Sequence, residues 1–425
     1  MSGCHASPPS RPPAAGGWKK LELAILEDYD KDEDLREVAR DFALFQSLGI
    51  HTWRGSFGWD DYEPSPGRYD FAWLDRFAAL ADSSGIRLRP YLGYTPEWAA
   101  EGRRTDGSVW NDPPARLDDW SRFVTALATA MKRHRNVASY EIYNEENVRA
   151  WWDGSAAEYD SVLVTASRAI RAADPRAQVV LGGMVWPDPD WVETACGVDA
   201  GAFDAVPFHA YPETWTPDSI RVENYLGTAY RDLLAAVDSC GSKPVWINET
   251  GFATVAGKSE TDQAAWWARA LATFAAAPRV SLIGIYEIKD LRPDHPAIGG
   301  AANYHLGLTR VDRTPKQAFR TVAYMGRFFA AESIRVEDAA VVVRAAGDRA
   351  HLQTHLFRRP DGRRLLVIWT YGQAASVDVR IPGGFTAARW VTLNGDEKPM
   401  EATRNGWLRH VALRRDRPVM VALDP

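Results

Sequence analysis

Residues 140–183 read YEIYNEENVRAWWDGSAAEYDSVLVTASRAIRAADPRAQVVLGG, and this stretch indicates the fold. It opens in an apolar run, passes through an acidic and aromatic loop, and continues with apolar residues three and four positions apart. It then ends in a second apolar run. That order predicts a strand, a helix and a parallel strand. The same alternation recurs from Trp18 to about residue 330.

The repeated alternation predicts a closed parallel barrel. Between the apolar runs lie helical patterns such as LREVARDFALFQSLG and DQAAWWARALATFAAA. Eight strands, each followed by a helix, are typical of a (β/α)8 TIM barrel. A doubly wound open sheet would have a glycine-rich turn after its first strand, and LEDYDKDED has none. The predicted strands are 21–26, 51–57, 86–92, 138–144, 178–183, 205–211, 244–249 and 282–288.

After about residue 333 the pattern changes to short alternating apolar runs between GD, PDG, PGG and NGD turns. Such runs predict a small C-terminal antiparallel β-sandwich domain. The expected organisation is a disordered linker over 1–17, a catalytic barrel over 18–333 and an accessory β-sandwich over 334–425. The runs that predict sandwich strands are 340–346, 351–357, 365–371, 376–381, 388–393 and 419–424.

The composition is that of a globular protein with a large core. The chain has 425 residues, 46% of them hydrophobic, and a formal net charge of −6, which argues against nucleic acid as a partner. No apolar stretch is long enough to predict a transmembrane segment. The 18 tryptophans offer flat apolar faces that suit sugar rings. Neither HExxH nor clustered Cys and His ligands occur, so we expect no metal and no cofactor.

The cysteines suggest alternatives for localisation. Ser2-Gly3-Cys4 resembles the end of a bacterial lipoprotein cleavage box, followed by a linker rich in Pro, Ala and Gly. A lipid anchor at Cys4 would make the protein an exported periplasmic or surface lipoprotein; otherwise it would be cytoplasmic. Cys196 and Cys240 are either a disulfide pair or two free thiols, and we expect both near the N-terminal ends of the barrel strands.

Asn144-Glu145 and Asn248-Glu249 are the two places where asparagine precedes glutamate. Both fall at the C-terminal ends of predicted strands, the fourth and the seventh, where a TIM barrel carries its reactive residues. Cleavage of a glycosidic bond with retention needs one carboxylic acid and one carboxylate about 5–5.5 Å apart. Strands four and seven lie on opposing sides of a barrel, so these glutamates are candidates for that pair.

Several segments resemble clan A glycoside hydrolases, most of all family 39 and related bacterial exopolysaccharide hydrolases. They are the opening stretch, GWDDYEPSPGRYDF, YTPEWA, FHAYP and PVWINETGFAT. The resemblance implies a retaining β-glycoside hydrolase that acts on a carbohydrate by a two-glutamate mechanism and is endo-acting on a bacterial exopolysaccharide. Glu145 would be the acid/base and Glu249 the nucleophile. The alternatives are an exo-acting β-xylosidase and a non-catalytic carbohydrate-binding barrel.

The resemblance also implies roles for neighbouring residues. Asn144 would bind the substrate 2-hydroxyl, His209 and Tyr211 would line the site, and Arg54 would keep the nucleophile ionised. Tyr286 stands where relatives have a tryptophan sugar platform. Of seven tryptophans near strand ends, two or three should stack on sugars; the seven are Trp59, Trp98, Trp110, Trp151, Trp152, Trp186 and Trp215.

Five further positions carry separate expectations. Glu146 replaces the proline usual after Asn-Glu, and we expect it to be a loop residue whose charge raises the pKa of Glu145. Glu141 should lie inside the barrel. Lys289, Asp290 and Arg292 follow the eighth strand and should form a solvated loop; the alternative is that they contact acidic or acetylated sugars.

Overall fold

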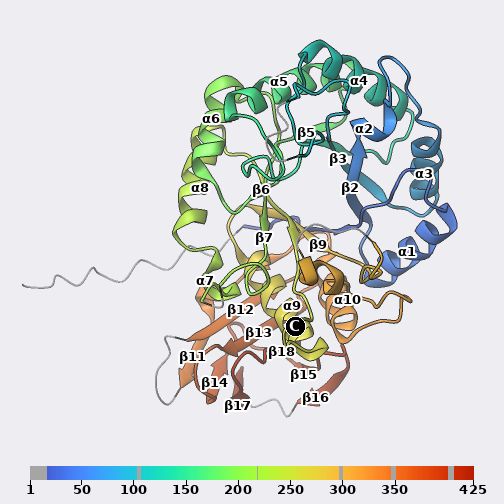
Figure 1. The fold of residues 1–425 in the computed structure, drawn as a ribbon. Helices are drawn as coiled ribbons and strands as arrows, with labels where there is room; N and C mark the ends of the chain where they lie inside the picture. The colour runs from blue at the N-terminus through green and yellow to red at the C-terminus, as the bar shows by residue number, and fades with distance from the viewer. Residues whose placement is uncertain (1–16, 103–106, 218, 296–299, 346–350, 401–405) are drawn as a thin grey trace, which may run out of the picture. The chain divides into compact units, whose positions relative to one another are not determined.

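The structure is a computed structural model that describes residues 17–102, 107–217, 219–295, 300–345, 351–400 and 406–425 (Figure 1). The predicted linker up to residue 16, with Cys4, lies outside these ranges. The chain divides into two compact units. One is Leu21–Ala330, and the other combines the start of the chain, through Lys20, with Ala331–Pro425.

The first unit is a parallel barrel, as predicted. Its sheet has the order β5-β4-β3-β2-β1-β9-β8-β7-β6, and every pairing between neighbours in this order is parallel. Its strands are β1 (Glu22–Leu26), β2 (Thr52–Gly58), β3 (Arg87–Gly93), β4 (Ser139–Ile142), β5 (Gln178–Val180), β6 (Met184–Val185), β7 (Val206–Ala210), β8 (Val245–Thr250) and β9 (Val280–Tyr286).

In place of the fifth predicted strand there are two short strands, β5 and β6. They lie on either side of a break in the strand, and each pairs with a different neighbour. β5 pairs with β4 and β6 pairs with β7, while Val180 also bridges to Ala205. The break is Leu181-Gly182-Gly183. A Cβ atom on Gly182 would lie 1.9 Å from Oε2 of Glu146. The glycines are therefore required because side chains from β4 and its loop approach the backbone here.

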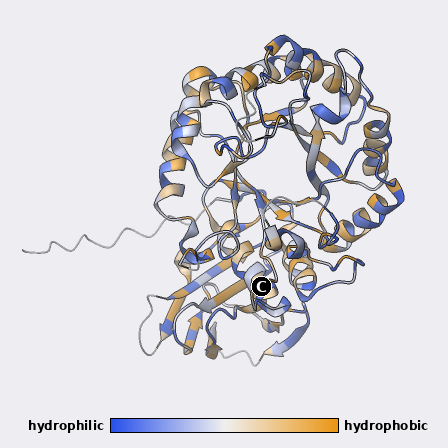
Figure 2. Ribbon diagram, in the orientation of Figure 1, coloured by the Kyte–Doolittle hydropathy of each residue, from blue (hydrophilic) through white to orange (hydrophobic). Residues whose placement is uncertain are grey.

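Helices surround the barrel strands in Figure 1. Their apolar faces are buried: α1, for example, buries Val38, Phe42, Phe45 and Leu48, and Figure 2 shows apolar and polar residues alternating along the helices. The helices are α1 (Leu35–Leu48), α2 (Trp59–Tyr62), α3 (Ala72–Ser83), α4 (Leu117–Met131), α5 (Ala156–Ala173), α6 (Pro189–Asp199), α7 (Val222–Tyr225), α8 (Thr228–Ser239), α9 (Glu260–Ala276) and α10 (Gln317–Phe329), with 3-10 turns η1 (Gly300–His305) and η2 (Asp338–Ala340).

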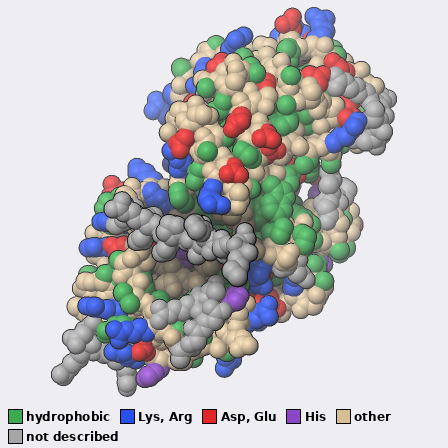
Figure 3. Space-filling model, turned by 90° about the vertical axis from the view of Figure 1, so that its left-hand side faces the viewer, with side chains coloured by type: hydrophobic (Ala, Val, Ile, Leu, Met, Phe, Trp, Pro, Cys, Tyr) green, Lys and Arg blue, Asp and Glu red, His purple; other side chains and the backbone are tan. Residues whose placement is uncertain are grey.

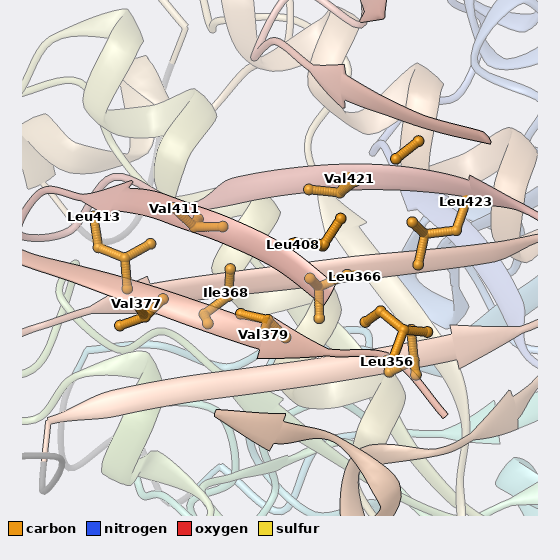
Figure 4. Close-up of a cluster of buried hydrophobic side chains, with 12 residues drawn as sticks. Leu356, Leu366, Ile368, Val377, Val379, Leu408, Val411, Leu413, Val421 and Leu423 are labelled. Atoms are coloured by element: carbon orange, nitrogen blue, oxygen red, sulfur yellow. The ribbon is translucent and has the colours of Figure 1, made fainter. Parts of the chain in front are cut away.

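The second unit contains a six-stranded sheet of order β10-β12-β13-β18-β15-β16 and a three-stranded sheet of order β11-β14-β17. Apolar side chains such as Leu366, Ile368, Val379 and Leu408 form one core cluster between strands of both sheets (Figure 4). The strands are β10 (Arg335–Val336), β11 (Val342–Ala345), β12 (Leu352–Arg358), β13 (Arg364–Thr370), β14 (Ala375–Arg380), β15 (Ala387–Val391), β16 (Glu397–Met400), β17 (Trp407–Leu413) and β18 (Val419–Asp424).

The sequence pattern missed β10, β16 and β17, and β17 has an identifiable cause. Val377 of β14 pairs with Val411, whereas Val379 pairs with Leu408, so β17 contains an extra residue. His410 in this bulge has a φ of 54°. The bulge changes the spacing of buried residues from two to three, and this change hides the alternation that predicts a strand.

Figure 3 shows one face of the molecule, on which basic and acidic side chains are interspersed. Within the described residues, a search for helices long and apolar enough to cross a membrane finds none.

Cys196, in α6, and Cys240, at the end of α8, form a disulfide with Cα atoms 5.7 Å apart. The bond closes a loop of 44 residues. In the chain-entropy model such a bond restricts the unfolded chain and stabilises the fold by about 3–4 kcal/mol.

We therefore expect a Cys196→Ser, Cys240→Ser double variant to lower the free energy of unfolding of the barrel by about 3–4 kcal/mol. Denaturant unfolding followed by tryptophan fluorescence measures the change. A reducing agent should destabilise the parent protein and leave the double variant unaffected. Equal stability of the parent with and without reductant would contradict the bond.

Candidate active site

A cavity of about 1150 Å³ opens at the carboxyl ends of the barrel strands. Residues that follow β1, β4, β6, β7, β8 and β9 line it. In a TIM barrel this face carries the reactive groups. Seven of the predicted site residues line the cavity and are brought together there: Asn144, Glu145, Trp151, His209, Tyr211, Glu249 and Tyr286.

Glu145 and Glu249 approach each other across the cavity. The Nδ1 atom of His209 lies 2.7 Å from Oε1 of Glu145 and 3.6 Å from Oε2 of Glu249. One carboxylate oxygen of each glutamate and one nitrogen of His209 lie within 4.8 Å of one another. Glu145 follows β4 with a φ of 54°, an uncommon left-handed conformation that marks a constrained turn.

Arg54, on β2, is hydrogen-bonded both to residues of β4 and its following loop and to Glu249 of β8. Its Nη1 donates to Oε2 of Glu249 at 2.9 Å, and its Nη2 donates to Oδ1 of Asn144 at 2.8 Å. Its Nε and Nη2 donate to the two oxygens of Glu141 at 2.9 and 2.6 Å, which is a bidentate pair. Arg54 and Glu141 are both buried, so Glu141 lies inside the barrel as expected.

Both carboxylate oxygens of Glu249 accept hydrogen bonds. Tyr211 donates to Oε1 at 2.5 Å, and Arg54 donates to Oε2. Burial raises the pKa of Glu249, while the charge of Arg54 and the Tyr211 hydrogen bond act in the opposite direction. Arg54 therefore favours the carboxylate form of Glu249, but burial outweighs it and the pKa of Glu249 stays above its ordinary value.

Glu145 lies in a different environment. Burial raises the pKa of Glu145 to about 7, and the charge of Arg54 opposes this only in part. Burial lowers the pKa of His209 to about 4, so its ring is neutral near pH 7. The Nε2 atom of His209 faces Nη2 of Arg54 at 3.5 Å, and an arginine can only donate. His209 Nδ1 therefore carries the proton and donates to Glu145.

Glu146 lies in a turn after β4, as expected for a loop residue, but its side chain is not in solvent. It is buried, and Oε1 accepts from Nε1 of Trp191 at 3.1 Å. Burial raises the pKa of Glu146 well above its ordinary value. The raised pKa of Glu145 comes from its own burial and not, as expected, from the charge of Glu146.

The tryptophans divide into core and cavity groups. Trp59 and Trp152 are buried and donate to Glu63 and to the Ser155 carbonyl, so their expected contact with substrate is wrong. Trp98 packs edge-on against Trp59 and does not line the cavity. Three of the seven tryptophans do line the cavity, namely Trp151, Trp186 and Trp215, and Tyr286 lines it with them.

The segment after β9 is also not a solvated loop. Lys289 forms ion pairs with Glu27 and with Asp41, and Lys316 donates to Asp290 at 2.6 Å. Arg292 is exposed and pairs with Asp294.

Sequence reasoning missed several carboxylates that line the cavity, among them Asp28 and Glu287. Each follows a barrel strand closely, Asp28 after β1 and Glu287 after β9. The strand-end rule that selected Glu145 and Glu249 would have included both.

The group formed by Glu145, His209 and Glu249 also has the spacing of a three-ligand metal site. Arg54 and Tyr211 already donate to the two oxygens of Glu249. A buried guanidinium 2.9 Å from one of these oxygens repels a second cation, so the residues present do not fit a metal ion.

Comparison with known proteins gives consistent results. Residues 28–103 match the family model described as beta-galactosidase, glycoside hydrolase family 42. A beta-xylosidase from Geobacillus stearothermophilus is 26% identical over 159 residues. That match covers 34% of this chain and 31% of the xylosidase, so the chain aligns with about a third of its curated relative.

Solved structures share the fold over nearly the whole chain. A family 39 glycoside hydrolase from Bacteroides cellulosilyticus WH2 superimposes with a TM-score of 0.73 and 18% identity, covering 96% of this chain and 81% of that one. A monomeric beta-xylosidase from Caulobacter crescentus CB15 gives 0.69 and 16%, covering 97% and 98%. The resemblance to clan A glycoside hydrolases of the family 39 type is confirmed.

The site electrostatics predict that Glu145 titrates near pH 7, because burial disfavours its charged form. Carbon NMR of protein labelled at the glutamate carboxyl groups measures this, and Glu145→Gln assigns the signal by its loss. Below pH 7 the group should be protonated, and above it ionised. A midpoint near 4.5, the ordinary value for glutamate, would contradict the environment described here.

Proposed function

We propose that the protein is a retaining β-glycoside hydrolase, with Glu249 as the nucleophile and Glu145 as the acid/base. One observation supports this most directly: carboxylate oxygens of the two residues lie within 4.8 Å of each other. Retaining enzymes have carboxyl groups about 5–5.5 Å apart, whereas inverting enzymes separate them by about 6.5–9.5 Å to admit a water.

In the first step, the carboxylate of Glu249 attacks the anomeric carbon of the substrate. The bond from that carbon to the glycosidic oxygen breaks, and the Glu145 carboxylic acid gives its proton to the departing oxygen. The product is a glycosyl ester on Glu249. A group with a pKa of about 7 is well suited to this donation, because a substantial fraction is protonated near neutral pH.

In the second step, Glu145 is a carboxylate and accepts a proton from water. The water oxygen attacks the anomeric carbon, and Glu249 leaves as a carboxylate, so the product keeps the starting configuration. Asn144 accepts from Arg54 through Oδ1, which leaves its Nδ2 to donate to the sugar 2-hydroxyl.

We infer that the substrate is a β-linked polysaccharide or oligosaccharide that is cleaved internally. The cavity of about 1150 Å³ exceeds the range of roughly 300–1,000 Å³ that is usual for small-molecule pockets. Trp151 and Trp186 line it beside β4 and β6, and Tyr286 lines it beside β9, so apolar faces are available on both sides of the glutamate pair.

An exo-acting β-xylosidase is the second candidate, because two of the similar proteins carry that name. The sizes of the early products distinguish the candidates. Internal cleavage of xylan, or of another polysaccharide in a panel, releases mixed oligosaccharides, and exo cleavage releases one small sugar only.

Azide rescue of alanine variants tests the assigned roles. We expect Glu249→Ala to lose activity on every aryl β-glycoside, with azide restoring a product of inverted configuration. Glu145→Ala should still form the glycosyl-enzyme from 2,4-dinitrophenyl glycosides, which need no proton donor, and azide should then give a product of retained configuration. On unactivated linkages Glu145→Ala should lose about 10²–10⁴-fold, the usual value of acid–base assistance.

Glu146→Gln is the matched control, since it keeps a neutral polar group one residue from Glu145. Azide should not restore turnover in this variant, with either inverted or retained product. The assignment would be wrong if Glu146→Ala were rescued by azide while Glu145→Ala remained active. A non-catalytic barrel would release no phenol from any aryl β-glycoside.

A further inference from the structure

One end of the cavity, next to β1 and β9, is lined by three carboxyl groups that have no ion-pair partner among the described residues. Asp28, Asp30 and Glu287 line it. Asp28 accepts only from neutral donors, the Tyr91 hydroxyl at 3.0 Å and the Ser56 backbone N–H at 3.2 Å. Among the described residues, no ion pair involves Asp28, Asp30 or Glu287.

The cations that line the same cavity are already paired. Lys289 pairs with Glu27 and Asp41, and Arg313 pairs with Asp41 and Glu37. The remaining two are Arg292, which pairs with Asp294, and Lys31, which pairs with Asp70. None of these cations pairs with Asp28, Asp30 or Glu287.

Glu287 provides an independent observation. It is only 2% exposed, and its Oε1 has no hydrogen-bond partner among the described residues. Burial raises the pKa of Glu287 well above its ordinary value, and Glu27, Asp290 and Asp28 add to this while Lys289 opposes it. An unpartnered buried carboxyl costs free energy, so its retention at a cavity wall indicates that a ligand supplies the partner.

These carboxylates lie close to the reaction centre. Tyr91, which donates to Asp28, stacks under the guanidinium of Arg54 at 4.8 Å, and Arg54 donates to Glu249. Glu287 directly follows Tyr286, whose ring lies 6.4 Å from that of Tyr211. A sugar beside Glu249 or in the next subsite is therefore within reach of Asp28 and Glu287.

We propose that this end of the cavity binds a sugar unit that carries an ammonium group, so that the substrate is a glycan containing amino sugars without N-acetyl groups. The inference rests on the proposed glycosidase function and names its substrate class. A neutral sugar would remove water from Asp28, Asp30 and Glu287 without supplying a positive charge. An ammonium group supplies both the charge and three donors.

Matched glycan pairs test the proposal on the full chain. The probes are chitosan and chitin oligosaccharides, and β-1,6-glucosamine oligomers with and without N-acetyl groups. Each pair differs only at the nitrogen, and xylo- and cello-oligosaccharides serve as neutral references. Binding is measured by calorimetry on Glu145→Gln, which prevents turnover.

We expect at least one free-amine oligomer to bind about tenfold or more tightly than its N-acetylated partner, with the preference decreasing as salt rises. Asp28→Asn, Asp30→Asn and Glu287→Gln should each reduce the preference. Asp28 and Asp30 are exposed, so their variants keep the test valid if the variant of the buried Glu287 fails to fold. Asp232→Asn, which removes an exposed charge on α8, should retain it.

Two results would overturn the proposal. One is that no free-amine oligomer binds more tightly than its N-acetylated partner. The other is that Asp28→Asn and Glu287→Gln weaken neutral and amino oligosaccharides equally, as carboxylates that accept from hydroxyl groups would. Neither result affects the azide test on aryl glycosides, so this inference can fail while the proposed function stands.

Discussion

The buried guanidinium of Arg54 is the interaction on which the site depends. It comes from β2 and joins Glu141 and Asn144, from β4 and the residues after it, to Glu249 of β8. A buried charge is tolerated only when it is paired and hydrogen-bonded, so these partners fix one another's positions. Removing Arg54 or Glu141 would leave the other as an unpaired buried charge. This explains the position of Glu141, which is buried next to Arg54 and does not line the cavity.

Arg54 also gives Glu145 and Glu249 different electrostatic environments. It donates directly to Glu249, together with Tyr211, whereas Glu145 receives only its more distant charge and the neutral ring of His209. One carboxyl is therefore held by cationic and hydroxyl donors, and the other has a pKa of about 7. A nucleophile and an acid that are both carboxyl groups need different environments, so that one is ionised while the other is protonated.

The barrel could be predicted from the sequence because each strand and helix has its own apolar period. The pairing of Glu145 with Glu249 could also be predicted, since strand ends converge at one face. Burial could not. Trp59, Trp152 and Glu146 follow strands as the cavity residues do, yet their side chains turn into the core. That choice depends on packing between residues far apart in the sequence, such as Glu146 with Trp191.

The most direct test of the account is to trap the glycosyl-enzyme. The protein is treated with 2,4-dinitrophenyl 2-deoxy-2-fluoro-β-glycosides of xylo, gluco and galacto configuration, then digested and analysed by mass spectrometry. The account predicts one added glycosyl group on the peptide containing Glu249, with no label after Glu249→Ala. A label on Glu145, Asp28 or Glu287, or turnover with inverted configuration and no label, would contradict it.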